Sequence, residues 1–543
     1  MNNKKRALSE IQDGEQDHAG LVCKSVVTPK KRRPNNETFI KSKEQLQQIQ
    51  QQNISKPQKR SSESSYDEPD LDVKFISDHN PVQRQDKEEA KNSQREVDEL
   101  KEEQKEICIK FDGTKLYTNR IKFYYSKAKI DNALSFKQLM SKDLLDEKDP
   151  GYDVDVKSAI FASFEYEEDL MLPLFSRKIP TTIFEDQIKR TDPLIFFADD
   201  EINCNKINVN KYDTVPYASY HSKVIIYQFE DRLRVILSSA NLTNYMWYYI
   251  QQCIWAQDFP LLKLPSSKSK LEERKSENDF KHSLGKYLEH LVPWNVRKNP
   301  DVFRQKINLD DYDFSKAQVH LVESINGRLK GDKISEYGLM RINSLIKQHH
   351  PLPEKSKIWI QASSIGRMWP KYLQDFYYTL TGILISEERI HDRFGFIYPT
   401  ESHARKSNLG INNCDCLHLK TTSWRQKGFP TGSFYRYEGR TELFNEDIAH
   451  SKVLIITDDD KGTINDNTFI YIGSHNMSSN AWGKFERNKE QFTIANWELG
   501  VSLIPKADSK DLKQSWIESL CFKFPPVKYK FGDIPYFGDV DYK

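Results

Sequence analysis

The chain carries one short sequence pattern twice, about 230 residues apart. The first copy begins with His221-Ser222-Lys223-Val224, and the second begins with His450-Ser451-Lys452-Val453. In each copy a Ser-x-Asn triplet follows, ending at Asn241 or at Asn476, and a Trp stands six residues after the Asn. This agreement in spacing predicts two related halves, with one site assembled from both.

The length of the chain supports a duplication of whole domains, because 543 residues can form two or more domains with separate cores. Apolar runs at residues 159–164, 224–227, 234–237 and 469–472 predict buried strands. A helix is predicted over residues 369–380, with Pro370 suited to its first turn. The pattern favours an α/β fold of two similar α-β-α sandwich domains with mixed sheets. We expect a pseudo-twofold relation between them and an active site at their interface.

The domain boundary is predicted near residue 310, where a polar segment precedes a new apolar strand at residues 319–322. Residues 358–363 resemble residues 160–163 in sequence and in their place before the motif. We therefore expect a first domain over residues 107–310 and a second over residues 311–543. Residues 1–106 contain too few apolar side chains to form a core, which predicts a disordered tail.

The predicted tail contains a dense basic cluster, Thr28-Pro29-Lys30-Lys31-Arg32-Arg33-Pro34. Such a cluster is typical of a nuclear import signal, although a basic tail that binds nucleic acid is an alternative and the two are compatible. The formal net charge is only +2, so any nucleic-acid surface must be local. The cysteines number seven and show no disulfide spacing, and no secretory leader precedes them. These features predict a soluble protein of the nucleus.

The residue types of the repeated pattern are those that handle phosphate. In a strand, side chains two residues apart point to the same face, so His221 would project with Lys223, and His450 with Lys452. The Asn of each copy follows an apolar strand, where a loop can carry it into a cleft. Lys and Asn both donate hydrogen bonds to phosphoryl oxygens, which stabilises the charge that develops on phosphorus.

Two histidines permit a division of labour that one cannot supply. A neutral imidazole can attack phosphorus, while a protonated one can donate to the leaving oxygen and later accept a proton from water. No cofactor or metal is expected, because the sequence shows no tight carboxylate cluster of the two-metal type. One copy alone would be read as structural, and the duplication makes catalysis the better interpretation. The residues themselves leave open which histidine is the nucleophile.

The duplicated His-x-Lys…Asn pattern resembles the phospholipase D superfamily, most members of which carry an Asp five residues after the Lys. Gln228 and Thr457 occupy these places here. This departure is similar to the tyrosyl-DNA phosphodiesterase I branch. The resemblance covers residues 107–543 and includes further runs around each motif and at the end of the chain. These runs are Gln252-Cys253-Ile254-Trp255, Ser363-Ser364-Ile365-Gly366, Ala481-Trp482-Gly483, Trp497-Glu498-Leu499-Gly500 and Phe531-Gly532-Asp533-Ile534-Pro535-Tyr536.

The resemblance implies hydrolysis of the bond between a DNA 3′-phosphate and the tyrosine of a stalled type IB topoisomerase, leaving a 3′-phosphate. It implies that His221 is the nucleophile and His450 the general acid and base. It also implies roles for three further groups. Lys223, Lys452, Asn241 and Asn476 would hold the phosphoryl oxygens; Gln252 and Glu498 would orient the histidines; Ser363, Ser364, Gly366, Ser478 and Asn480 would contact the DNA backbone, with Tyr217 stacking on a base.

Two other functions compete with this one. A lipid phosphodiesterase would fit the wider superfamily, but the chain lacks the Asp residues and any evident membrane anchor. A non-catalytic DNA-end binder would retain the motif only as a phosphate clamp. The run Cys414-Asp415-Cys416-Leu417-His418 lacks the second ligand pair that a structural zinc needs, so a loop with free thiols is expected. The expected partners are single-stranded or duplex DNA with blocked 3′ ends and a topoisomerase-derived peptide; we expect a monomer without membrane contact.

Overall fold

The computed structural model describes residues 110–124, 132–144, 153–186, 196–209, 215–216, 218–262, 278–292, 307–349 and 352–542. The predicted tail with its basic cluster and the candidate Tyr217 lie outside the described residues. Within the described part of the chain, no helix has the length and apolar character needed to cross a membrane.

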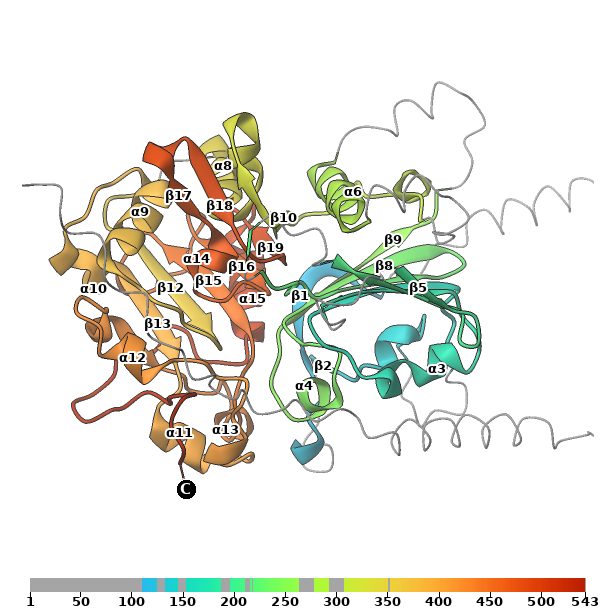
Figure 1. The fold of residues 1–543 in the computed structure, drawn as a ribbon, viewed down its shortest axis with the longest axis horizontal. Coiled ribbons are helices and arrows are strands. Elements are labelled where there is room, and N and C mark those ends of the chain that lie inside the picture. Colours follow the sequence, from blue (N-terminus) through green and yellow to red (C-terminus); the bar gives the residue numbers. More distant parts are fainter. Residues whose placement is uncertain are drawn as a thin grey trace, which may run out of the picture. The chain divides into compact units, whose positions relative to one another are not determined.

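The first sheet has nine strands in the order β2-β1-β9-β8-β7-β3-β4-β6-β5. It is mixed, because β3, β4 and β6 run parallel while β3, β7, β8, β9 and β1 pair in antiparallel fashion. Helices cover both faces, with α6 on one side of β8 and β9 and with α3 and α4 on the other (Figure 1). Two-sided cover explains why strands such as β7 are apolar runs rather than alternating ones. The strands are β1 (Asp112–Asn119), β2 (Ala133–Leu134), β3 (Ser158–Ser163), β4 (Thr181–Glu185), β5 (Phe196–Asp199), β6 (Cys204–Asn208), β7 (Val224–Gln228), β8 (Arg232–Ser238) and β9 (Ile254–Pro260).

The second sheet has seven strands in the order β10-β19-β16-β15-β12-β13-β14. A three-stranded sheet, in the order β11-β18-β17, stands beside it. The strands of these two sheets are β10 (His320–Ser324), β11 (Gly327–Leu329), β12 (Lys357–Ala362), β13 (Phe394–Tyr398), β14 (Phe434–Arg436), β15 (Lys452–Thr457), β16 (Phe469–Gly473), β17 (Lys484–Glu486), β18 (Gln491–Ile494) and β19 (Glu498–Leu503).

The two large sheets repeat one topology. The order β1-β9-β8-β7-β3-β4-β6 matches β10-β19-β16-β15-β12-β13-β14 strand by strand, with four antiparallel pairings followed by two parallel ones in each. The predicted α/β class with two similar halves and mixed sheets is therefore confirmed. The predicted strands at residues 159–164, 224–227, 234–237, 319–322 and 469–472 correspond to β3, β7, β8, β10 and β16.

Helices and short 3-10 turns connect the strands. The helix predicted over residues 369–380 is α9, which begins with Pro370 and ends where Gly382 adopts a left-handed φ of 74°. The α-helices are α3 (Leu172–Phe175), α4 (Asn244–Tyr248), α6 (Asp279–Leu291), α8 (Gly338–His349), α9 (Pro370–Thr381), α10 (Ile390–Arg393), α11 (Glu401–Lys406), α12 (Thr421–Trp424), α13 (Glu442–Asn445), α14 (Ser479–Trp482) and α15 (Lys510–Ser519). The 3-10 turns are η1 (Lys122–Tyr124), η2 (Gln138–Met140), η3 (Glu168–Met171), η5 (Leu309–Asp311), η6 (Gly331–Glu336), η7 (Glu387–Arg389), η8 (Ile411–Asn413), η9 (Thr431–Ser433) and η10 (Arg487–Lys489).

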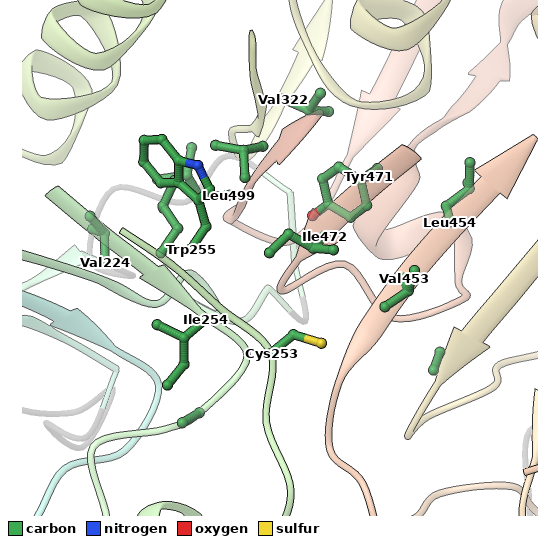
Figure 2. Packing of buried hydrophobic residues seen from close by; sticks show 14 of the residues in the cluster. Val224, Cys253, Ile254, Trp255, Val322, Val453, Leu454, Tyr471, Ile472 and Leu499 are labelled. Atoms are coloured by element: carbon green, nitrogen blue, oxygen red, sulfur yellow. The ribbon is translucent and has the colours of Figure 1, made fainter. Parts of the chain in front are cut away.

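One apolar core runs through both halves. The buried side chains of the two large sheets form a single contact cluster. Figure 2 shows Trp255 and Cys253 at the start of β9 in the same cluster as Ile472 and Leu499 of the second sheet. The last helix, α15, contacts β1 of the first sheet. The halves are thus joined by packing as well as by the chain.

Candidate active site

The segments that carry the two histidines cross between the halves. The His221 amide donates to the Trp497 carbonyl at 2.9 Å, and the Trp497 amide donates to Ser219 at 2.9 Å. The His450 amide donates to the Gln251 carbonyl at 2.8 Å. Each of these contacts belongs to a short parallel β-bridge between one half and the other. Each histidine is therefore placed beside a strand of the opposite sheet, at the start of β19 or of β9.

His221 is held by a buried carboxylate from the second half. Its Nδ1 donates to Glu498 Oε2 at 2.8 Å, and the Glu498 side chain is completely buried. Glu498 also accepts hydrogen bonds from Ser474 Oγ at 2.5 Å and from Asn496 Nδ2 at 3.2 Å. Because a carboxylate only accepts, Nδ1 carries the proton and the lone pair of the neutral ring lies on Nε2.

His450 is held by a backbone carbonyl from the first half. Its Nδ1 donates to the Ser239 carbonyl at 2.9 Å, so the lone pair of the neutral ring is again on Nε2. The Lys452 ammonium lies 2.8 Å from that Nε2 atom and also donates to the His450 carbonyl at 2.6 Å. The two imidazoles therefore share one tautomer but differ in what stands behind them. His221 has a carboxylate there, and His450 has a neutral carbonyl.

The ammonium groups of the two lysines have different hydrogen-bond partners in the two halves. Strand β7 begins at Val224 and β15 begins at Lys452, so both histidines precede their strands. The Lys223 ammonium donates to the His221 carbonyl, whereas the Lys452 ammonium reaches the His450 ring itself. The prediction that each pair projects from within a strand is therefore only approximate, because the chain leaves its sheet before the imidazole.

Burial of several cationic groups together shapes the electrostatics of the site. Burial, followed by the charges of Lys223 and Lys452, lowers the pKa of His221 well below its usual value. The pKa of His450 is lowered for the same reasons, with His221 contributing. Burial also lowers the pKa of Lys223 to about 7 and moves that of Lys452 in the same direction. These lowered pKa values favour the neutral imidazole at both histidines in the free protein, and both rings lie close enough to the two lysines to be affected by their charge.

Gln252 and Glu498 occupy equivalent positions but act differently. Ser239 Oγ donates to Gln252 Oε1 at 2.8 Å, as Ser474 Oγ donates to Glu498. The Gln252 amide donates to the Met246 carbonyl at 3.1 Å. Gln252 thus supports the serine whose carbonyl holds His450, while Glu498 contacts its histidine directly.

Both asparagines lie between a strand and a capped helix. Asn476 Oδ1 accepts hydrogen bonds from the Ser364 amide at 3.1 Å and from Ser363 Oγ at 3.4 Å, which leaves its NH₂ group as the donor. Asn241 is buried, and its Oδ1 has no hydrogen-bond donor among the described residues. Thr243 caps α4 and Ser478 caps α14 in the same way, through a side-chain oxygen that accepts an amide of the first turn.

The residues expected at the DNA backbone gather around Asn476. The Gly366 amide donates to the Met477 carbonyl at 2.9 Å, and a Cβ on Gly366 would lie 3.2 Å from Cβ of Ser478. Ser363 and Ser364 contact Asn476 as described above. The Asn480 carbonyl accepts from two amides of the segment before β19. Ser363 is buried, Ser364, Gly366 and Ser478 are partly exposed, and Asn480 is exposed.

The sequence interpretation missed several neighbours of the histidines. Ser239 and Ser474 belong to the duplicated triplets, so the repeat itself carried a signal for them. Phe164, with its ring centroid 5.9 Å from that of His221, carries no such signal, and neither does His418, which contributes to lowering the pKa of His221. Cys414 and Cys416 are free and buried. No group of three or more potential metal ligands occurs within the described residues.

Comparison with known proteins agrees with this geometry. The tyrosyl-DNA phosphodiesterase family model matches residues 121–530. Tyrosyl-DNA phosphodiesterase 1 of Arabidopsis thaliana is 26% identical over 309 residues, which cover 54% of this chain and 47% of that protein. The chain therefore spans about half the length of this relative. A probable tyrosyl-DNA phosphodiesterase of Schizosaccharomyces pombe is 21% identical over 431 residues, covering 61% of this chain and 77% of that protein.

The fold has a solved counterpart. The crystal structure of yeast tyrosyl-DNA phosphodiesterase superposes with a TM-score of 0.55 at 18% identity, covering 78% of this chain and 98% of that one. At this identity the likeness concerns the fold alone. The family model, in contrast, matches most of the chain, including both histidine motifs and both crossed segments. The chain belongs to the tyrosyl-DNA phosphodiesterase family.

Proposed function

We propose that this protein is a metal-independent phosphodiesterase of DNA repair. It hydrolyses the bond between a DNA 3′-phosphate and the tyrosine of a stalled type IB topoisomerase, and it removes other 3′ adducts. The reaction passes through a covalent phosphohistidine and leaves a 3′-phosphate. The observation that carries this proposal is the pair of imidazoles from the two halves, His450 buried and His221 largely buried, each with Nδ1 engaged.

In the first step His221 is the nucleophile. Its neutral Nε2 attacks phosphorus, the new N–P bond forms, and the bond from phosphorus to the tyrosine oxygen breaks. The ring becomes positively charged, and the Glu498 carboxylate at its Nδ1 stabilises this charge. A phenol has a pKa near 10, so the leaving oxygen needs only modest protonation.

His450 is the general acid of the first step and the general base of the second. A bound phosphodiester adds negative charge between Lys223 and Lys452, which raises the pKa of His450 from its low value in the free protein. His450 then takes up a proton from solvent at Nε2 and, in the first step, donates it to the leaving phenolate. It afterwards takes a proton from water, the water oxygen attacks phosphorus, and the bond to His221 breaks. When the product leaves, its negative charge is lost and His450 releases the proton to solvent, so both imidazoles are neutral again.

The four remaining polar groups hold the phosphoryl oxygens. The ammonium groups of Lys223 and Lys452 stand beside the two histidines, and the amide groups of Asn241 and Asn476 follow β8 and β16. Donors fixed before the reaction stabilise the charge that builds up on a pentacovalent phosphorus. Gln252 contributes by supporting Ser239, as its hydrogen bond indicates.

The rest of the proposal concerns the surroundings of the site. The DNA backbone lies along Ser363, Ser364, Gly366, Ser478 and Asn480, with Tyr217 as the base platform. The folded domains are residues 107–310 and 311–543, and the chain acts as a monomer in the nucleus on single-stranded or duplex DNA that bears a 3′ topoisomerase peptide. Family membership weighs against the lipid phosphodiesterase. A non-catalytic DNA-end binder would not need the Glu498 carboxylate behind His221.

The test is cleavage of an oligonucleotide that carries a 3′-phosphotyrosine, with EDTA present. Wild type should release tyrosine, and His221→Ala should not. His450→Asn should accumulate a covalent protein–DNA species on a denaturing gel, because the phosphohistidine is not resolved. His282→Ala, at an exposed position of α6, is the matched control and should behave as wild type. An adduct formed by His221→Ala but not by His450→Asn would reverse the roles, and a folded, inactive wild type would refute the proposal.

A further inference from the structure

The second half contains a chain of buried polar side chains behind the active site. Tyr471 Oη hydrogen-bonds to His475 Nδ1, and His475 Nε2 lies 2.9 Å from Ser324 Oγ. Ser324 Oγ donates its own proton to the Ala481 carbonyl at 2.8 Å. The serine oxygen must therefore accept from His475, so Nε2 of the imidazole carries the proton and Nδ1 accepts from the tyrosine. Both ring nitrogens of His475 are engaged, and each bond has a fixed direction.

The first half has no imidazole at the equivalent place. The backbone amide of Gln252 donates to Asn119 Oδ1 at 2.8 Å, whereas in the other sheet Ser324 is the strand partner of Glu498. A single Asn119 amide donates to the Trp247 carbonyl at 2.7 Å and to the Ile250 carbonyl at 2.8 Å. The residue at the place of His475 is an alanine, Ala240. The polar chain is thus a feature that distinguishes the two halves.

The residues around this network of side chains leave room for the Tyr471 ring and pack against the His475 ring. A Cβ on Gly473 would lie 2.1 Å from Tyr471 Oη, and a Cβ on Gly500 would lie 2.3 Å from Cε2 of the same ring. Only glycine leaves room for the tyrosine at both places. The His475 ring also stacks on Trp482, with centroids 4.1 Å apart. Figure 2 shows Tyr471 within the apolar cluster of the second sheet. The imidazole is therefore fixed by packing as well as by hydrogen bonds.

His475 stands between two residues of the site. Ser474 donates to Glu498, the carboxylate that holds His221, and Asn476 lies against Ser364. Fixing the His475 side chain in the core fixes the backbone on both sides of it. The network therefore reaches the nucleophile through Ser474 and the phosphate through Asn476. It has no comparable route to His450, which the first half holds.

We propose that Tyr471, His475 and Ser324 are positioning residues that align His221 and its carboxylate partner for the attack on phosphorus. This inference rests on the proposed function and adds the residues that position its nucleophile. The network should act on formation of the phosphohistidine, the step in which His221 must be aligned with phosphorus. None of the three residues touches the substrate.

The test measures adduct formation in single turnovers, in a background of His450→Asn so that the covalent species accumulates. Tyr471→Phe, which removes one oxygen atom, should slow adduct formation at saturating DNA by about 10-fold, because small misplacement of reacting groups is costly. The DNA concentration that gives half of the maximal rate should stay unchanged. His475→Gln, which keeps hydrogen-bonding capacity, should be faster than His475→Ala.

The matched control is Tyr398→Phe. Tyr398 is a buried tyrosine of β13 in the same sheet, and its hydroxyl has no hydrogen-bond partner among the described residues. Equal adduct formation by Tyr471→Phe and Tyr398→Phe would overturn the inference, and so would weaker DNA binding with an unchanged maximal rate. If His450→Asn forms no adduct and wild type releases no tyrosine, the proposed function itself fails. The two failures are therefore distinguishable.

Discussion

Glu498→Gln tests whether the carboxylate behind His221 assists the attack. It places a glutamine in the second half, where the first half has Gln252. Glutamine keeps the size of the side chain and can still accept from His221 Nδ1, now 2.8 Å from the carboxylate. A hydrogen bond to a charged group is worth ~1.5–3 kcal/mol, against about 1 kcal/mol for a neutral one. The positive ring formed during the attack should therefore lose ~1–2 kcal/mol of stabilisation. At a factor of ten for each ~1.4 kcal/mol, formation of the phosphohistidine should slow by ~5- to 30-fold.

The assay is single-turnover release of tyrosine at saturating DNA, together with denaturant unfolding of the same variant. Stability should not fall, because burial raises the pKa of Glu498 and an amide is cheaper to bury than a carboxylate. The control is Glu323→Gln on the neighbouring strand β10. Glu323 is also buried, its pKa is raised to about 8 by burial, and its Oε2 has no hydrogen-bond partner among the described residues. Equal rates for the two variants would show that the carboxylate does not assist the attack.

Further perturbations test the electrostatics and the supporting structure. Because Lys223 has a pKa of about 7 and must be charged to hold phosphate, kcat/KM should fall as pH rises through about 7; a flat profile there would contradict this role. Ser239→Ala leaves the buried Gln252 Oε1 without its donor and should lower the free energy of unfolding by ~1–3 kcal/mol, as urea titration can measure. Ser433→Ala removes a buried hydroxyl that has no hydrogen-bond partner among the described residues, and it should cost less. Asp258 accepts from the fully buried Arg234 guanidinium at 2.6 Å. Asp258→Ala leaves that charge unpaired and should lower the free energy of unfolding by ~3–5 kcal/mol. A loss below about 1 kcal/mol would mean that water reaches the arginine.

The repeat predicted much of the fold and of the site, since a duplicated motif constrains both. Residues such as His450 and Asn476 could be chosen because a second copy showed that their spacing is not accidental. The strands were predictable because sheets covered on both faces require continuous apolar runs. The matching order of strands in the two sheets was predictable only as a likeness between halves, because pairing partners are not encoded in any short run.

The crossing of the histidine segments could not be predicted. The bridges join residues far apart in sequence, such as Tyr220 with Trp497, and no local pattern marks them. The different roles of Gln252 and Glu498 were hidden for the same reason, because only the folded chain shows that one reaches a serine and the other a histidine. The role of His475 was hidden because it looks like a variable position inside the Ser-x-Asn triplet.

The crossed segments also determine when the protein becomes competent during folding. The carboxylate at the first histidine comes from a residue 277 positions later in the chain. Such distant contacts form late, because the intervening chain must first be organised. A half that has folded by itself would hold an imidazole without its partner, so the proposed nucleophile would lack its carboxylate. The protein can therefore become active only after β19 has been synthesised and the two halves have packed together.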